Sequence, residues 1–178
     1  MQQIAQINQE APDFRLPGAY HGEVHHYSLT QYRGGWVVLF FYPADFSFIC
    51  PTEVRGFSEN CSDFRDTGAE ILGVSTDPIK SHIAWSRELG GVEYPLLSDE
   101  SKEVCRLYNA LNEKEGVALR ATFIVDPAGF VQYSAVTNNN VGRSVEETFR
   151  VFSALRTGRM CPADWKPGDT TFDTDMRY

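Results

Sequence analysis

The sequence predicts one α/β domain, with a central mixed β-sheet flanked by helices and an irregular C-terminal tail. Three observations lead to this prediction. An unbroken apolar and aromatic run occupies 36–42, strand-like and helix-like segments alternate around it, and 160–178 contains Pro and Gly without a regular pattern. Strands that alternate with helices and end in a hairpin are typical of α/β domains with a mixed sheet. We place the domain over 1–157 and the tail over 158–178.

Five segments have the composition of β-strands, and the second gives the strongest signal. Its sequence, WVVLFFY, lies between a Gly-Gly pair and Pro43, which is typical of a central strand buried on both faces. The last two segments flank an Asp-Pro-Ala-Gly turn at 126–129 and predict a hairpin. An extended lead-in is expected over 10–16. The five segments are 27–29, 36–42, 70–76, 121–125 and 130–136.

Four further segments predict helices. In the second of them, Asp77 is the expected N-cap and Pro78 the first helical residue. In the fourth, Ser144 and Glu147 have the spacing of a capping box. The expected helices cover 51–64, 77–89, 101–109 and 144–155.

The composition limits the classes of partner. The 178 residues carry a formal charge of −8, which argues against nucleic acid and anionic membranes, since both select a basic surface. No stretch approaches the roughly 18 apolar residues of a membrane span. The first 14 residues lack the basic start and apolar core of a signal peptide. We therefore expect a cytoplasmic protein, in which cysteines stay reduced unless the chemistry needs otherwise.

Four cysteines are the candidates for chemistry: Cys50, Cys61, Cys105 and Cys161. None forms a CxxC pair, and no His lies at ligand spacing from any of them. The sequence therefore predicts no metal site.

Cys50 has the position of a reactive cysteine. It follows the central strand after a short loop and precedes Pro51, and proline is tolerated in the first turn of a helix. Helix N-termini carry unpaired N–H groups and a partial positive charge, which favour thiolate over thiol. The thiolate is the nucleophile, whereas an unperturbed thiol with a pKa of about 8.5 is mostly protonated at neutral pH. The alternative is a small buried hydrophobe.

Two neighbours of Cys50 also have two interpretations. Ser47 can be an N-cap residue, and a capping hydroxyl can also face a bound oxygen atom. Glu53 is either an acidic first-turn residue favoured by the helix dipole or part of the site. An acid there opposes a thiolate unless a cation offsets it, so we expect a nearby arginine.

The motif Pro43-x-x-x-Ser47-x-x-Cys50, within FYPADFSFICPTE, resembles the active-site signature of peroxiredoxins. More narrowly, it is similar to the typical two-cysteine group that includes the peroxidase subunit of bacterial alkyl hydroperoxide reductase. The resemblance continues in the same order through APDF (11–14), VSTD (74–77), AW (84–85), YPLLSD (94–99), RATFIVDPAG (120–129), GRSVEE (142–147) and CPADWKPG (161–168). It implies a thioredoxin-like fold.

The resemblance also implies roles for individual residues. Cys50 matches the peroxidatic cysteine, Pro43 the proline that shields it, and Ser47 the position where the family usually has Thr. Arg120 matches the arginine beside the sulfur. Taken alone, Arg120 would be interpreted as a solvated charge at a hairpin end.

Glu53 would then orient Arg120, and Arg143 resembles a second arginine of the same network. The implied reaction is attack of the Cys50 thiolate on hydrogen peroxide or an organic hydroperoxide, which leaves a sulfenic acid. No metal or other cofactor is implied, because the chemistry belongs to sulfur.

A second thiol must resolve the sulfenic acid. Cys61 lies 11 residues after Cys50 in the same expected helix, so the two are about 16 Å apart, too far for a disulfide. Cys105 fits core packing better. Cys161 lies in the Pro- and Gly-containing tail and matches the family's resolving cysteine, which acts across a dimer interface. The segment before it, ALRTGRMC, is several residues shorter than is usual in the group.

The resemblance implies dimers that assemble into decamers, and recycling by thioredoxin or a flavoprotein disulfide reductase. Two alternatives belong to other classes. A thiol–disulfide reductase shares the fold but needs a CxxC pair, which is absent. A holdase or redox-signalling relay shares the sequence and differs only in use.

Overall fold

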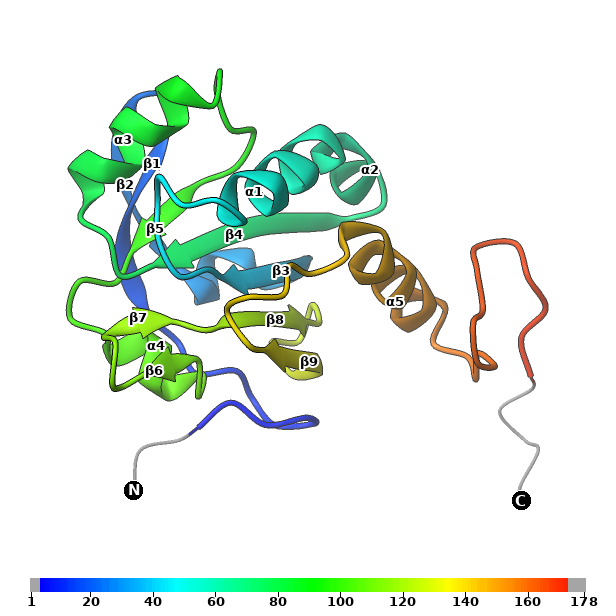
Figure 1. Ribbon diagram of the computed structural model, residues 1–178. Helices are drawn as coiled ribbons and strands as arrows, with labels where there is room; N and C mark the ends of the chain where they lie inside the picture. Colours follow the sequence, from blue (N-terminus) through cyan, green and yellow to red (C-terminus); the bar gives the residue numbers. More distant parts are fainter. Residues whose placement is uncertain (1–3, 173–178) are drawn as a thin grey trace. The chain divides into compact units, whose positions relative to one another are not determined.

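The computed structural model describes residues 4–172 (Figure 1). The chain divides into two compact units, Met1–Arg143 and Ser144–Tyr178. The first contains the β-sheet, and the second contains one helix and the segment that follows it. The expected domain organisation, 1–157 followed by 158–178, remains a prediction.

The first unit is built around a seven-stranded sheet in the order β2-β1-β5-β4-β3-β8-β9. Strand β4 pairs in parallel with β3 and β5, and the other pairs in this sheet are antiparallel. The predicted mixed sheet is confirmed. The elements are β1 Arg15–Tyr20, β2 Glu23–Ser28, the 3-10 helix η1 Leu29–Tyr32, β3 Trp36–Phe41, α1 Cys50–Glu59, α2 Cys61–Asp66, β4 Ala69–Ser75, α3 Ile79–Glu88, β5 Leu96–Ser98, α4 Glu103–Leu107, β6 Leu111–Asn112, β7 Val117–Ala118, β8 Arg120–Val125 and β9 Val131–Thr137.

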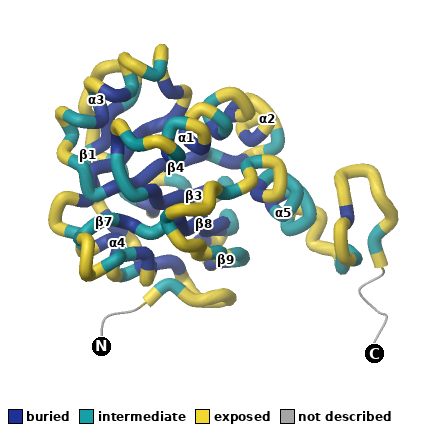
Figure 2. Tube along the Cα trace, in the orientation of Figure 1, coloured by how far each residue is buried: buried dark blue, intermediate teal, exposed yellow. Residues whose placement is uncertain are grey.

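Strand β3 is apolar throughout because both of its faces are covered (Figure 2). Side chains alternate across a strand. The Phe41 ring lies 5.4 Å from that of Tyr108, which follows α4 on one face. The Phe40 ring stacks at 4.5 Å on Phe57 of α1, so α1 covers the other face. Burial of such a side chain contributes about 1.5–3 kcal/mol, so the run positions α1 against the sheet.

The register of the sheet brings three chain segments to one edge. Phe41, the last residue of β3, pairs with Ala121 near the start of antiparallel β8. Arg120, the first residue of β8, pairs with Thr137, the last residue of β9. The loop that leads to α1 and the segment after β9 therefore leave the sheet at the place where Arg120 enters it.

The helix predicted over 51–64 is two helices, because the chain breaks at Asn60 (φ −100°, ψ 7°). The Asn60 side chain donates to the Gly56 carbonyl at 2.7 Å, and asparagine side chains compete with the helical backbone in this way. Cys61 therefore begins α2, and the prediction that it shares a helix with Cys50 is wrong.

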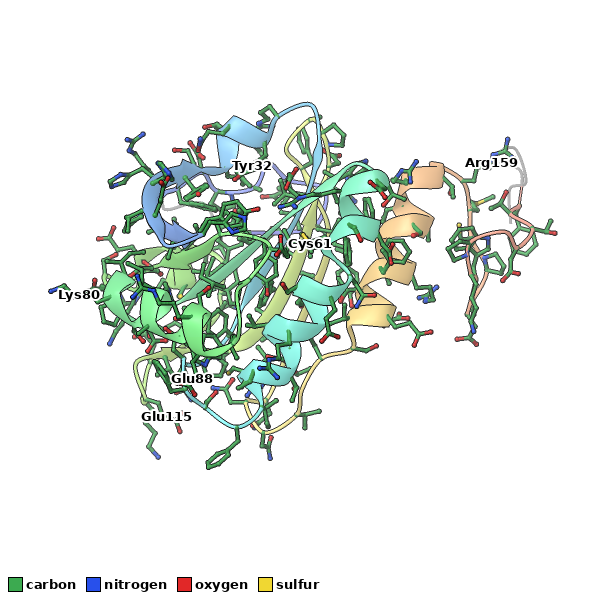
Figure 3. All side chains as sticks on the ribbon, turned by 90° about the horizontal axis from the view of Figure 1, so that it is seen from above. Tyr32, Cys61, Lys80, Glu88, Glu115 and Arg159 are labelled. Atoms are coloured by element: carbon green, nitrogen blue, oxygen red, sulfur yellow. The ribbon has the colours of Figure 1, made fainter. Side chains whose placement is uncertain are left out.

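Helix α3 starts one residue later than predicted. Its N-cap is Pro78, because the Asp77 carboxylate instead accepts hydrogen bonds from the Ser75 hydroxyl at 2.6 Å and the Asp45 N–H at 2.9 Å. His82 of this helix is buried, whereas Lys80 is exposed (Figure 3).

Several short strands were not predicted. The expected lead-in over 10–16 runs into β1, and the short strand expected over 27–29 is β2, which starts at Glu23. Strand β5 has only three residues, and strands β6 and β7 have two each. Such segments are too short for a periodic pattern to identify.

The second unit contains α5, Val145–Thr157. The Ser144 hydroxyl accepts the Glu147 N–H at 3.0 Å, which confirms the predicted N-cap. The Glu147 side chain pairs with Arg150 rather than closing the capping box. After the helix, the chain forms an isolated bridge between Met160 and Phe172. Within residues 4–172, no helix has the length and apolar character needed to cross a membrane.

Candidate active site

Cys50 is the first residue of α1, with Ile49 as N-cap and Pro51 in the first turn. Its side chain is fully buried. The sulfur therefore lies at the N-terminal end of a ten-residue helix, where the field of the backbone favours a negative charge. This is the predicted placement.

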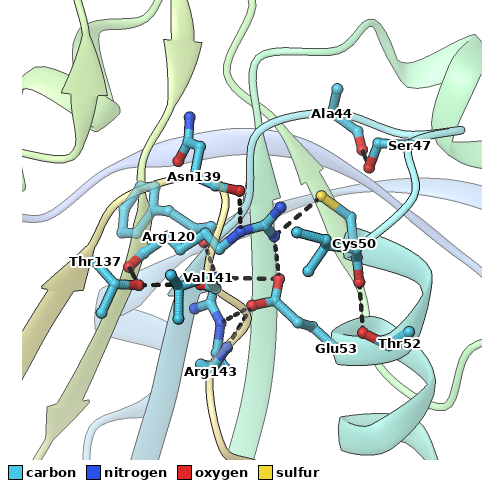
Figure 4. A network of polar contacts seen from close by, with 12 residues as sticks. Ala44, Ser47, Cys50, Thr52, Glu53, Arg120, Thr137, Asn139, Val141 and Arg143 are labelled. Carbon is cyan, nitrogen blue, oxygen red and sulfur yellow. Dashed lines mark hydrogen bonds and ion pairs between the residues drawn. The ribbon is translucent and has the colours of Figure 1, made fainter.

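Arg120 is buried against this sulfur (Figure 4). Its Nη1 lies 3.3 Å from Cys50 Sγ and 2.6 Å from Glu53 Oε2. Its Nε donates to the Asn139 carbonyl at 2.9 Å. The contacts at Nε and Nη1 therefore fix the orientation of the guanidinium. The alternative interpretation of Arg120 as a solvated charge at a hairpin end is wrong.

Glu53 joins the two arginines. Its Oε1 accepts the Arg143 N–H at 2.9 Å and the Arg143 Nε–H at 3.0 Å. Arg143 also donates to the Ala121 carbonyl at 2.7 Å and to the Phe41 carbonyl at 2.5 Å. These contacts hold the segment after β9 against the start of β8.

The cluster of Arg120, Arg143 and Glu53 has a net positive charge that one further anion would neutralise. Arg120 and Arg143 contribute two positive charges and Glu53 one negative charge, and all three are buried. Burial lowers the pKa of Arg143, and Glu53 opposes that shift. A Cys50 thiolate would make the cluster neutral, and buried charges are stable only when they are paired.

Pro43 and Ser47 lie in the loop between β3 and α1, and both are half-buried. The Ser47 hydroxyl donates to the Ala44 carbonyl at 2.9 Å. Ser47 is not the N-cap of α1, which is Ile49. Within residues 4–172 no hydrogen bond joins Ser47 to Cys50, so its predicted role remains a prediction.

The other three cysteines have different surroundings, and all four are free thiols. Cys61 donates to the Glu93 carbonyl at 3.4 Å, and burial raises its pKa while Arg65 opposes the shift. Cys105 is fully buried in the core, and burial raises its pKa well above the usual range. Cys161 belongs to the second unit, where its sulfur lies 3.5 Å from Thr157 Oγ1.

Two further features of the site were not predicted. Besides their side-chain partners, Arg120 and Arg143 bind three backbone carbonyls, those of Asn139, Ala121 and Phe41. Because every residue has a carbonyl, the residue type at 139 gives no signal for this contact. Asp45 and His82 form a buried pair next to the loop. An aspartate within an otherwise apolar and aromatic segment was the available signal for that pair.

A buried cysteine at a helix start, with a guanidinium against its sulfur, defines a thiol-dependent enzyme on an α/β scaffold. Comparison with known families identifies it further. The model of the AhpC/TSA family matches residues 7–134. The chain belongs to this family.

Individual relatives agree with this assignment. The chain is 49% identical over 181 residues to ycf42 of Porphyra purpurea, covering 96% of this chain and 90% of the relative. It is 42% identical over 182 residues to the chloroplastic 2-Cys peroxiredoxin BAS1 of Spinacia oleracea, covering 96% and 69%.

Solved structures give the same result. The reduced 2-Cys peroxiredoxin of Plasmodium vivax superimposes with a TM-score of 0.87 at 35% identity, covering 93% of this chain and 91% of that one. Mycobacterium tuberculosis AhpC gives a TM-score of 0.82 at 34% identity, covering 92% and 99%. These comparisons confirm the thioredoxin-like fold, and the protein is a peroxiredoxin, a thiol-dependent peroxidase.

Proposed function

We propose that Cys50 is the peroxidatic cysteine and that its thiolate reduces hydrogen peroxide and organic hydroperoxides. The observation that carries this proposal is the 3.3 Å contact between Arg120 Nη1 and Cys50 Sγ, with Glu53 bound to the same nitrogen. A cation in that position stabilises the thiolate form of the sulfur. It also lies where negative charge develops during the reaction.

In the first step, the Cys50 thiolate attacks the nearer peroxide oxygen. A sulfur–oxygen bond forms as the oxygen–oxygen bond breaks, and the departing alkoxide or hydroxide takes a proton to leave as alcohol or water. Sulfur is oxidised to sulfenic acid and the peroxide is reduced. Arg120, the Ser47 hydroxyl and the first-turn N–H groups of α1 stabilise the charge on the departing oxygen. Pro43 shields the sulfur, and Arg143 acts through Glu53.

In the second step, Cys161 of a partner subunit attacks the sulfenic acid. A disulfide forms and water leaves. A disulfide needs Cα atoms within about 7 Å, and Cys50 is fully buried in the first turn of α1. That turn therefore has to open before the two sulfurs meet. The homodimer assembles further into a decamer.

In the third step, an external dithiol reduces the disulfide and returns both thiols. Thioredoxin and a flavoprotein disulfide reductase are the two candidate donors. Because the protein carries out sulfur chemistry with reduced cysteines, we place it in the cytoplasm.

The test is a comparison of Cys50→Ser with wild type and with Cys105→Ser. Stopped-flow measurement with hydrogen peroxide and a thioredoxin system should show turnover in wild type and in Cys105→Ser, and none in Cys50→Ser. Peroxide consumption by Cys50→Ser at the wild-type rate would exclude the proposal.

A further inference from the structure

A second buried polar network lies beside the active-site loop. The Asp45 carboxylate is fully buried and makes three hydrogen bonds. It accepts from Tyr42 OH at 2.8 Å and Ser81 Oγ at 2.7 Å, and it shares the third with His82 Nδ1 at 2.7 Å. The Asp45 backbone N–H donates to the Asp77 carboxylate at 2.9 Å. Asp45 is therefore anchored through both its side chain and its backbone to the end of β4 and the start of α3.

His82 uses both ring nitrogens in this network and is fully buried. Its Nε2 lies 3.1 Å from the Leu97 carbonyl of β5. A carbonyl can only accept, so Nε2 carries a hydrogen there. One proton then lies between Nδ1 and the Asp45 carboxylate. Buried carboxylates are stable only when their oxygens are satisfied in this way.

Tyr42 completes the network from the end of β3. Burial raises its pKa well above the usual range, and the Asp45 carboxylate raises it further. Its hydroxyl therefore remains a donor to Asp45. The network thus connects the segment after β3 with α3 and β5.

The segment between Asp45 and Cys50 makes few contacts: the Phe46 ring lies 6.3 Å from that of Trp85 in α3, and the Ser47 hydroxyl donates to the Ala44 carbonyl. Phe46 adopts a left-handed backbone conformation (φ 53°), which is uncommon for a bulky residue and persists only where the surroundings enforce it. Phe48 is completely exposed and Phe46 is 54% exposed. The position of Ser47 and of the chain that enters α1 therefore depends strongly on what holds the chain just before them.

We propose that Asp45 and His82 are positioning residues for the peroxidase reaction. They fix the loop so that Cys50 meets the Arg120 guanidinium. Neither residue touches the reacting sulfur in the structure. This inference rests on the proposed role of Cys50 and adds to it the requirement that a network outside the Cys50–Arg120–Glu53 cluster sets the geometry of the first step.

The experiment separates the two chemical steps. In stopped-flow measurements, oxidation of Cys50 by hydrogen peroxide and the later disulfide formation are recorded as separate phases. His82→Leu should slow oxidation about ten- to a hundredfold, the size expected when a reacting group is misplaced by about 1 Å. It should leave disulfide formation as fast or faster, because that step needs the loop and first turn to open. His82→Asn, whose amide can replace Nδ1 as a donor, should restore most of the oxidation rate.

The matched control is Asp126→Ala. Asp126 caps the β8–β9 turn by accepting the Phe130 N–H at 2.9 Å, and it lies at the other end of β8 from Arg120, about 20 Å away. It should lower the urea midpoint without changing the oxidation phase. If His82→Leu does not fold, Asp45→Asn gives the same measurement with a nearly isosteric side chain.

Two results would overturn the inference. One is oxidation at the wild-type rate in His82→Leu or Asp45→Asn. The other is equal slowing of both steps, reproduced by Asp126→Ala at a matched urea midpoint, which would indicate a general loss of stability. Either result leaves the proposed function standing, because that depends on the separate Cys50→Ser comparison.

Discussion

Arg120 and Cys50 stand 70 residues apart in the chain, yet the arginine Nη1 lies 3.3 Å from the cysteine sulfur. The antiparallel pairing of β3 with β8 makes this contact possible, because it brings the start of β8 to the end of β3. Helix α1, which carries Cys50, begins nine residues after the end of β3. The contact is thus a consequence of strand order and register.

Substitution of Arg120 tests the electrostatic part of the site. Arg120→Met should slow oxidation of Cys50 by hydrogen peroxide about a hundred- to a thousandfold. This is the loss of rate typical when an enzyme loses one hydrogen-bond donor that stabilises the charge developing in the transition state. Arg120→Lys should also be slow, because an ammonium group cannot bind the sulfur, Glu53 and the Asn139 carbonyl in one plane.

The measurement is the second-order rate constant from single-turnover stopped flow. Arg106→Lys is the control, since Arg106 forms an exposed ion pair with Glu113. A wild-type rate in Arg120→Met would contradict the role proposed for the guanidinium.

Glu53→Gln should destabilise the fold by about 3–5 kcal/mol, the cost typical of removing one partner from a buried ion pair. The side chain keeps its size but no longer offsets the two buried guanidinium groups. Urea unfolding of the reduced protein gives the free energy of unfolding.

Glu59→Gln provides the comparison, because Glu59 is an exposed residue in the last turn of the same helix. It should change stability by no more than about 0.5 kcal/mol. Equal stability of the two variants would show that the ion pairs around Glu53 contribute nothing to folding.

The sequence was sufficient for the central strand, the helix start at Cys50 and the hairpin, because each has a strong local signal. It failed at Asn60, where one side chain competes for the Gly56 carbonyl and splits a helix. It also missed β5, a three-residue strand stabilised by its neighbours on either side.

In the site, too, the residues with a local signal in the sequence were predicted and those that depend on tertiary contacts were not. Residue type and motif pointed to Cys50, Glu53 and Arg120, whose contacts depend on side chains. The aspartate in an apolar and aromatic segment indicated that Asp45 needs a partner, but the sequence did not identify His82, because the pair forms only when α3 packs beside the loop. The choice of partner depends on tertiary structure, and a single sequence contains no local pattern for it.

The thiols of Cys61 and Cys105 should be slow to react at neutral pH. Burial raises the pKa of Cys61 and of Cys105, so both remain protonated where an ordinary thiol begins to ionise, near pH 8.5. Because the thiolate is the reactive form, their alkylation should increase only as the pH rises beyond that range. Cys161 is more exposed and should react before either of them.

Peptide mapping after timed iodoacetamide treatment, at neutral pH and at about pH 10, measures the order of reaction. A urea-unfolded sample serves as the reference in which all four cysteines are accessible. Labelling of Cys105 as fast as that of Cys161 in the folded protein would contradict the prediction.

Cys161→Ser tests the resolving step. The variant should consume about one equivalent of peroxide per subunit and then stop. Oxidation of Cys50 to the sulfenic acid needs no second thiol, but the next step does. Wild type should show a disulfide-linked dimer on non-reducing gels after peroxide treatment, and Cys161→Ser should not.

Cys61→Ala is the matched control, since Cys61 begins α2 and donates a hydrogen bond to the Glu93 carbonyl. It should keep both the dimer band and turnover with a thioredoxin-type reductant. A dimer band that persists in Cys161→Ser and disappears in Cys61→Ala would assign resolution to Cys61, and intact-mass analysis of the oxidised wild type would then identify the sulfur bound to Cys50.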